Sequence, residues 1–229
     1  MGLSARAALD RDLRALREDL LKLGNQTSQA ILSSMQSLSD RDHERAEEII
    51  ENDDRLNALR YKIEESCLGM IATRQPTARD LRAIVAAMNI AGDLERMGDH
   101  AAGIAKISLL TSVEESLDLP GSLTKMVTLV HEMLGIALEA YRQGDDHRAY
   151  SVATKDDLID EQYKTLFREL VELIGKKPEI TSASVYLMFV GHNLERIADR
   201  ATNIAERVVF MTSGEMRELN PEPGASGTN

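Results

Sequence analysis

The sequence predicts an all-α protein made of two tandem three-helix bundles, and three observations support this. Aromatic residues make up only 3% of the chain and Trp is absent, so aliphatic side chains and Met must form the core. Such a core suits packed helices better than β-sandwich layers. Apolar residues recur at three- and four-residue spacing along most of the 229 residues. In addition, one segment is repeated at an offset of one hundred residues.

Start and stop residues delimit the first three expected helices. A helix over about 4–38 ends at the Ser-Asp pair at 39–40, which can cap a second helix that continues to about residue 73. Pro76 stops the second helix, and Thr77 caps a third, with Asp80 in the position of a capping-box acid. We expect this third helix to run to about residue 110.

The last three expected helices have similar boundaries. After a break that contains Pro120, Ser122 opens the fourth helix and Gly144 stands in a C-cap position. Asp145 caps the fifth helix, which closes at the Lys-Lys-Pro run ending at Pro178. The sixth helix covers about 181–211.

The internal repeat shows how these helices are grouped. DLERMGDHAAGIA, starting at Asp93, matches NLERIADRATNIA, starting at Asn193. Upstream, NDDRLN ending at Asn57 resembles KDDLID ending at Asp160, at an offset of 103. A duplicated three-helix unit follows, with a first domain over 1–114, a second over 115–212, and a disordered tail over 213–229 that is rich in Pro and Gly.

Acidic residues spaced four apart recur in both halves. Glu95 and Asp99 lie opposite the apolar stripe of the third helix, among small side chains, and Glu195 and Asp199 repeat this arrangement in the sixth. Carboxylates at this spacing point the same way and repel each other, so something should compensate their charge. Local arginines at 96 and 196 are one candidate.

A bound cation is the other candidate. Two further oxygen pairs at the same spacing, Asp53 with Asn57 and Asp156 with Asp160, lie on the second and fifth expected helices. Oxygen-only ligands fit a hard or borderline ion such as Mg, Mn, Fe or Zn, with water completing the shell. Ordinary solvated charged faces are the alternative interpretation, and the sequence leaves both open.

With these motifs, the chain resembles the PhoU family of phosphate-specific transport system regulatory proteins. The resemblance covers nearly all of the chain up to about residue 212. Its carrying residues are RQPTARDLR at 74–82, DLERMGD at 93–99, NLERIAD at 193–199 and the two Asp-x-x-x-Asn/Asp pairs. It implies two three-helix PhoU domains, with iron- or zinc-type centres held by E(D)-x-x-x-D motifs.

The resemblance also implies a cytoplasmic negative regulator that restrains the phosphate-starvation response. Its expected partners are the ATPase subunit of the phosphate ABC transporter and a sensor histidine kinase, through which the protein would reach the membrane. The implied metal ligands are Glu95, Asp99, Asp53 and Asn57 in the first half, and Glu195, Asp199, Asp156 and Asp160 in the second. Two departures from the pattern fall in the first half: Asn57 replaces an acid, and Gly103 stands where the second repeat has Asn203.

Composition narrows the remaining classes of function. A formal net charge of -11 argues against sequence-independent binding of nucleic acid. No signal-peptide-like or membrane-spanning apolar run occurs, which fits a cytoplasmic protein, and Cys67 is interpreted as a small core residue. His100 and His192 adjoin the acid motifs and are interpreted as surface or packing residues.

Two rival functions remain open beside the regulator. The first is a helical adaptor without metal, whose acids only pair with local cations. The second is a carboxylate-bridged di-metal enzyme, which is disfavoured because neither Glu95 nor Glu195 has a His three residues later. We therefore expect no catalysis. The small and Met side chains are compatible with a monomer and with a homodimer.

Overall fold

The computed structural model describes residues 3–111 and 118–220, and these are almost entirely helical. The elements are α1 (Leu3–Asp40), α2 (His43–Arg74), α3 (Ala78–Leu110), α4 (Gly121–Gln143), α5 (Asp146–Lys176), the short 3₁₀ turn η1 (Pro178–Ile180) and α6 (Thr181–Ser213). No strand occurs within these two ranges. The all-α prediction and the six long helices are confirmed.

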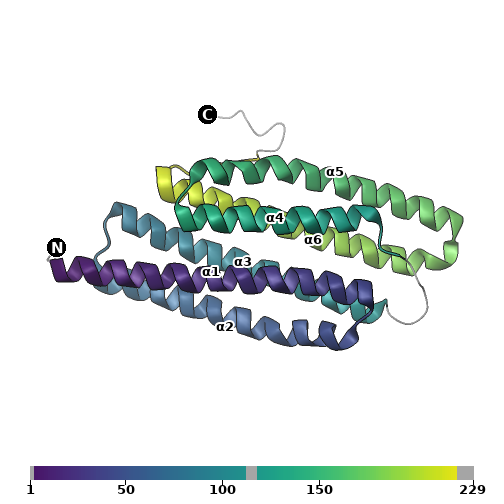
Figure 1. The fold of residues 1–229 in the computed structure, drawn as a ribbon, viewed down its shortest axis with the longest axis horizontal. Helices are drawn as coiled ribbons and strands as arrows, with labels where there is room; N and C mark the ends of the chain where they lie inside the picture. The colour runs from purple at the N-terminus through teal and green to yellow at the C-terminus, as the bar shows by residue number, and fades with distance from the viewer. Residues whose placement is uncertain (1–2, 112–117, 221–229) are drawn as a thin grey trace.

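The two bundles lie side by side along their length (Figure 1). Helices α1 to α3 form the first and α4 to α6 the second, with α3 packed against α6 and α1 against α4 between them. Buried side chains of all six helices belong to one continuous apolar cluster. The expected link around 111–121 falls largely on residues 112–117, which lie outside the described part. Over residues 3–111 and 118–220, no helix is long and apolar enough to cross a membrane.

The connection between α1 and α2 differs from the prediction. Helix α1 continues through Asp40, Arg41 takes a left-handed conformation at φ 56°, and Asp42 is the N-cap of α2. The Asp42 carboxylate accepts a hydrogen bond from the backbone N–H of Arg45 at 3.0 Å. Capping by residues 39–40 is therefore wrong, because the reversal needs one residue with positive φ before the cap. The internal repeat indicates the correct cap, because Asp42 lies 103 residues before Asp145, which is the N-cap of α5.

The predicted caps at Thr77 and Gly144 are confirmed. Thr77 is the N-cap of α3, and its hydroxyl donates a hydrogen bond to Asp80 Oδ2 at 2.7 Å. Asp80 Oδ2 also lies 2.7 Å from Arg6 Nη1, so this carboxylate links the start of α1 to the start of α3. Gly144 ends α4 at φ 67°, in the left-handed region that favours glycine.

The C-terminal residues pack more extensively than a disordered tail would. Helix α6 ends at Ser213, with Gly214 as a left-handed C-cap. Leu219 then packs against the apolar core, and its backbone N–H donates to Glu206 Oε1 at 3.0 Å. Residues 214–220 thus differ from the expected tail because an apolar side chain anchors them, while 221–229 lie outside the described residues.

The single cysteine lies in the core of the first bundle. Cys67 has no exposed surface, and its Sγ lies 3.7 Å from the backbone carbonyl of Ile84. Burial raises the pKa of the Cys67 thiol to about 11. The thiol is therefore protonated near neutral pH, as its interpretation as a core residue requires.

Candidate metal centres

Some of the predicted acids of each half interact electrostatically across neighbouring helices. In the first half, the negative charge of Asp99 helps to raise the pKa of Asp53 on α2 and of Glu95 on α3. In the second half, the negative charge of Glu195 on α6 helps to raise the pKa of Asp156 on α5. We name the set Asp53, Asn57, Glu95 and Asp99 the first cluster, and the set Asp156, Asp160, Glu195 and Asp199 the second cluster.

Close packing of α2 on α3 encloses part of the first cluster. Gly98 permits this approach, because a Cβ there would lie 2.6 Å from Leu56 Cδ1 and 3.5 Å from Asp53 Oδ1. Asp53 Oδ2 accepts a weak hydrogen bond from Asn57 Nδ2 at 3.4 Å. Asp53 Oδ1 is buried and has no hydrogen-bond partner among the described residues. A buried carboxylate oxygen without a partner is costly, and a cation would relieve that cost.

Burial and mutual repulsion act together on the first cluster. Burial raises the pKa of the Asp53 carboxyl, and the Asp99 charge adds to this effect. Burial likewise raises the pKa of Glu95, again helped by Asp99, while Arg60 opposes the shift. Arg60 Nη1 lies 3.8 Å from Glu95 Oε1, which makes it the nearest basic partner of that carboxylate. The charge of Arg96 opposes the shift as well, by less than that of Arg60 on α2.

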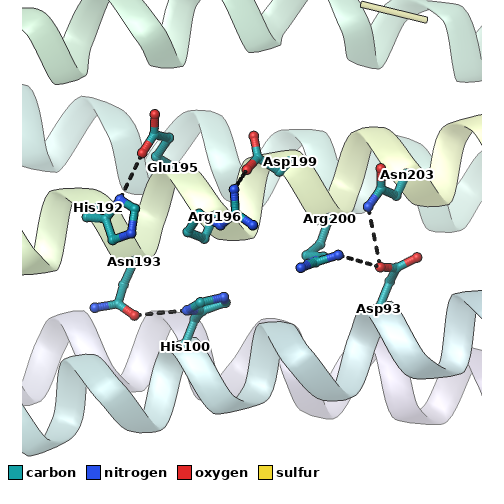
Figure 2. A network of polar contacts seen from close by, with 9 residues as sticks. All are labelled: Asp93, His100, His192, Asn193, Glu195, Arg196, Asp199, Arg200 and Asn203. Atoms are coloured by element: carbon teal, nitrogen blue, oxygen red, sulfur yellow. Dashed lines mark hydrogen bonds and ion pairs between the residues drawn. The ribbon is translucent and has the colours of Figure 1, made fainter. Parts of the chain in front are cut away.

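The second cluster has more local partners than the first. Arg196 Nη1 lies 2.8 Å from Asp199 Oδ2, as expected for a local ion pair, and His192 Nδ1 lies 3.0 Å from Glu195 Oε2 (Figure 2). Asp156 Oδ2 accepts a hydrogen bond from Asn220 Nδ2 at 2.8 Å. Burial nevertheless raises the pKa of Asp156 and of Asp199, and nearby carboxylates add to both shifts.

The donor chemistry of both clusters suits a cation with several water ligands. Among the side chains that the structure describes, no three His, Cys, Asp or Glu groups already converge into a metal-holding set. Asp53 Oδ1 has no hydrogen-bond partner among the described residues, and the carboxylates repel one another. Both features would favour a hard or borderline ion, because such ions bind a few protein oxygens and complete their shell with water.

A polar seam between α3 and α6 lies beside the clusters, and it was not predicted from the sequence. Asp93 Oδ1 lies 3.4 Å from Arg200 Nη1 and 3.5 Å from Asn203 Nδ2 (Figure 2). His100 Nδ1 lies 2.9 Å from Asn193 Oδ1. His100 is therefore a packing residue, as interpreted, whereas His192 is exposed and pairs with Glu195.

The seam follows the internal repeat as a pseudo-twofold contact. The repeat equates Asp93 with Asn193 and His100 with Arg200, so the Asp93–Arg200 and His100–Asn193 contacts are equivalent. The same pseudo-twofold relation explains why the first repeat has Gly103 where the second has Asn203. A Cβ at Gly103 would lie only 3.2 Å from Asn193 Oδ1, so the first repeat leaves space where the second carries Asn203. The offset of one hundred residues was the signal that could have revealed this contact.

Two three-helix bundles with acidic residues at equivalent places in each define a tandem-repeat helical protein. The family model of the PhoU domain matches residues 20–108 and 123–208, and each range covers most of one bundle. The chain therefore belongs to the PhoU family, and the resemblance seen in the sequence is confirmed.

Relatives and solved structures extend this match over nearly the whole chain. A phosphate-specific transport system accessory protein PhoU homolog of Clostridium acetobutylicum is 34% identical over 216 residues, covering 94% of this chain and 99% of that protein. A homolog with the same description from Caulobacter vibrioides is 38% identical and covers 89% of each. The crystal structure of the phosphate transport system regulatory protein PhoU from Streptococcus pneumoniae aligns with a TM-score of 0.85 at 33% identity, covering 91% of this chain and 99% of that one.

Proposed function

We propose that the protein is a cation-binding negative regulator of phosphate uptake and of the phosphate-starvation response. It acts in the cytoplasm by contact with the ATPase subunit of the phosphate ABC transporter and with a sensor histidine kinase. Membership of the PhoU family and the descriptions of its relatives support a regulatory role in phosphate transport. The duplicated carboxylate clusters carry the cation part of the proposal.

The proposed ligands are the side-chain oxygens of the two clusters. They are Glu95, Asp99, Asp53 and Asn57 in the first half, and Glu195, Asp199, Asp156 and Asp160 in the second. An Fe, Zn, Mn or Mg ion bound there would neutralise carboxylates that burial and mutual repulsion disfavour as charged groups. The protein itself acts by binding: ion occupancy changes the charge of a bundle face and so its contact with partners.

Metal content tests the site assignment. Protein purified without chelator should lose about half of its bound metal in a Glu95→Ala/Asp99→Ala variant, and a similar share in a Glu195→Ala/Asp199→Ala variant, because each removes two of four oxygen ligands. Elemental analysis by mass spectrometry gives metal per chain. The control is Glu47→Ala/Glu51→Ala, an exposed acid pair at the same spacing on α2. Equal metal content in all variants would refute the assignment.

Deletion of the gene tests the regulatory role. Cells without the protein should keep phosphate-responsive genes switched on in high phosphate, measured with a promoter reporter. Plasmid-borne wild-type protein should restore repression, and both cluster variants together should not. Continued repression in the deletion strain would contradict the proposal.

A helical adaptor without metal is the second candidate. The second cluster supports it, because Arg196 and His192 already pair with Asp199 and Glu195. The adaptor would repress phosphate-responsive genes with the cluster acids replaced, whereas the cation-binding regulator would not.

A further inference from the structure

Helix α6 separates its charges onto two sides. Each of its three acids is followed directly by an arginine, and neighbouring helical residues point about 100° apart, so the acids and the arginines form two rows. Figure 2 shows Glu195 and Asp199 on the α5 side of the helix and Arg196 and Arg200 on the α3 side. The acid row is Glu195, Asp199 and Glu206, and the arginine row is Arg196, Arg200 and Arg207. The α3 side of α6 is therefore basic in a chain whose net charge is -11.

The side chains that α3 contributes to the seam leave this positive charge largely in place. Asp93 is only 13% exposed and already pairs with Arg200. Burial lowers the pKa of His100, and the charges of Arg196 and Arg200 lower it further, so the field of the arginine row extends across the seam. The repeat equates Arg96 with Arg196, which makes the exposed Arg96 a further cation facing the seam from α3.

Large apolar side chains are exposed near the start of α6. Val185 is 46% exposed and Phe189 is 55% exposed. Phe167 of α5 is 56% exposed, and Gly191 of α6 packs on Leu166, the neighbour of Phe167, so both phenylalanines flank the contact between these two helices. Two of the three Phe residues of the chain thus meet solvent near one helix contact, although burial of this side chain is strongly favourable.

The apolar residues and the arginines of α6 lie on one continuous stripe. Successive members are four, seven, four and seven residues apart, which keeps them within about 60° around the helix axis over a length of roughly 33 Å. We name this set the α6 stripe, and its members are Val185, Phe189, Arg196, Arg200 and Arg207. Such a surface is complementary to a segment that has apolar side chains at one end and carboxylates along the rest.

We propose that the α6 stripe docks an acidic amphipathic segment of a partner protein. Apolar side chains of that segment pack on Val185 and Phe189, and its carboxylates bind the arginine row. Arg196 is available for this exchange, because its pair with Asp199 is solvent-exposed and therefore weak. The inference deepens the proposed function: it rests on action through contact with partner proteins, and it adds the face and the chemistry of the partner.

Charge favours a protein segment over an anionic membrane as the occupant. The acid row lies on the adjacent side of α6, and the chain as a whole is strongly negative, so an anionic bilayer is repelled around the stripe. A stripe one helix wide matches a single polypeptide segment, whereas a bilayer would meet the acids at the same time as the arginines.

Affinity for the two proposed partners tests the docking surface. The purified ATPase subunit and the cytoplasmic part of the sensor kinase are immobilised, and binding of the protein is followed by biolayer interferometry. Arg96→Glu/Arg196→Glu should weaken binding to at least one partner on the order of tenfold. Val185→Ser/Phe189→Ser, which lies outside both clusters, should weaken it by a similar factor.

The matched control is Arg11→Glu/Arg14→Glu, which reverses two exposed charges of α1 and should leave both affinities unchanged. Circular dichroism checks that every variant is folded. Wild-type affinity for both partners in the two α6 stripe variants, or an equal loss in the control, would overturn the inference and leave the proposed function standing. Failure of the wild-type protein to bind either partner would refute the proposed function together with the inference.

Vesicles of phosphatidylcholine and phosphatidylglycerol test the membrane as occupant. The wild-type protein should remain in the supernatant when these vesicles are sedimented. Sedimentation with them that Arg96→Glu/Arg196→Glu abolishes would overturn the assignment of the α6 stripe to a protein partner.

Discussion

At the scale of single residues, buried polar groups are the positions where a substitution has the clearest expected effect. Asp80 is the strongest case, because its carboxylate is only 8% exposed and is bonded by both Thr77 and Arg6. Burial raises the pKa of this carboxyl, but the Thr77 and Arg6 hydrogen bonds outweigh that effect and hold it below its ordinary value. Ionised Asp80 therefore stabilises the folded chain.

Asp80→Ala should lower the free energy of unfolding at pH 7 by about 1.5–3 kcal/mol, the usual range for hydrogen bonds to a charged group. Since the pKa is lower in the folded state, this contribution is complete above the unfolded value of about 3.9 and is lost as pH falls through the folded value. Urea unfolding should show the gap between wild type and variant narrowing below about pH 4. The control, Glu65→Ala, changes an exposed acid of α2. A gap that widens in acid would contradict this account.

At the scale of helices, close approach between elements depends on a few small residues. Gly24 of α1 faces Leu138 of α4 across the contact between the bundles, and a Cβ there would lie 2.6 and 2.7 Å from the two methyl carbons of Leu138. Gly135, about one turn before Leu138 on α4, is exposed, and a Cβ added to it would meet no atom within 4 Å. These two helical glycines differ only in their packing.

Gly24→Ala should destabilise the protein by about 1 kcal/mol, because overpacking of about 1–3 kcal/mol exceeds the helix-propensity gain of about 0.5–1 kcal/mol. Gly135→Ala has the helix-propensity gain without overpacking, so it should raise the free energy of unfolding by about 0.5–1 kcal/mol. Chemical denaturation followed by circular dichroism measures both. Equal shifts in the same direction would show that Leu138 does not depend on the space above Gly24.

At the scale of the whole molecule, the seam between α3 and α6 joins the two bundles into one folding unit. One large apolar cluster contains buried side chains of both bundles, and the Asp93–Arg200 pair bridges them with side chains only 13% and 20% exposed. Burial raises the pKa of Asp93, so the partners Asn203 and Arg200 offset only part of its desolvation. The cost is compensated by the apolar contacts around the seam.

The protein should therefore unfold in one cooperative transition, and the seam pair should be coupled. A double-mutant cycle of Asp93→Ala and Arg200→Ala should give a coupling energy of about 1–3 kcal/mol. The solvent-exposed Glu139–Arg142 pair of α4 is the control and should give a clearly smaller coupling energy, because water screens it. Denaturation curves measured by circular dichroism provide both values. Two separate transitions in wild-type protein would contradict the single folding unit.

The sequence by itself determined the helices, most caps, the duplication and the eight candidate ligands. These features depend on periodicity, on residues such as Pro76, Thr77 and Gly144, and on spacing along one helix, all of which are local. The N-cap of α2 was predicted wrongly, because the reversal at Arg41 depends on a left-handed backbone conformation that the residue type does not indicate.

Only the tertiary structure decided what crosses between helices. Tertiary packing placed Arg60 beside Glu95. It also placed the Asn193 side chain against Gly103, and it brought Asn220 within hydrogen-bond distance of Asp156. Such contacts join residues far apart in the chain, so no local pattern encodes them, and packing sets their distances. The sequence thus predicted two oxygen pairs in each half, with Asn57 and Gly103 as departures in the first. The fold added further differences. Among the described residues, the buried Asp53 Oδ1 of the first cluster has no hydrogen-bond partner, and the second cluster receives an amide from the C-terminal segment.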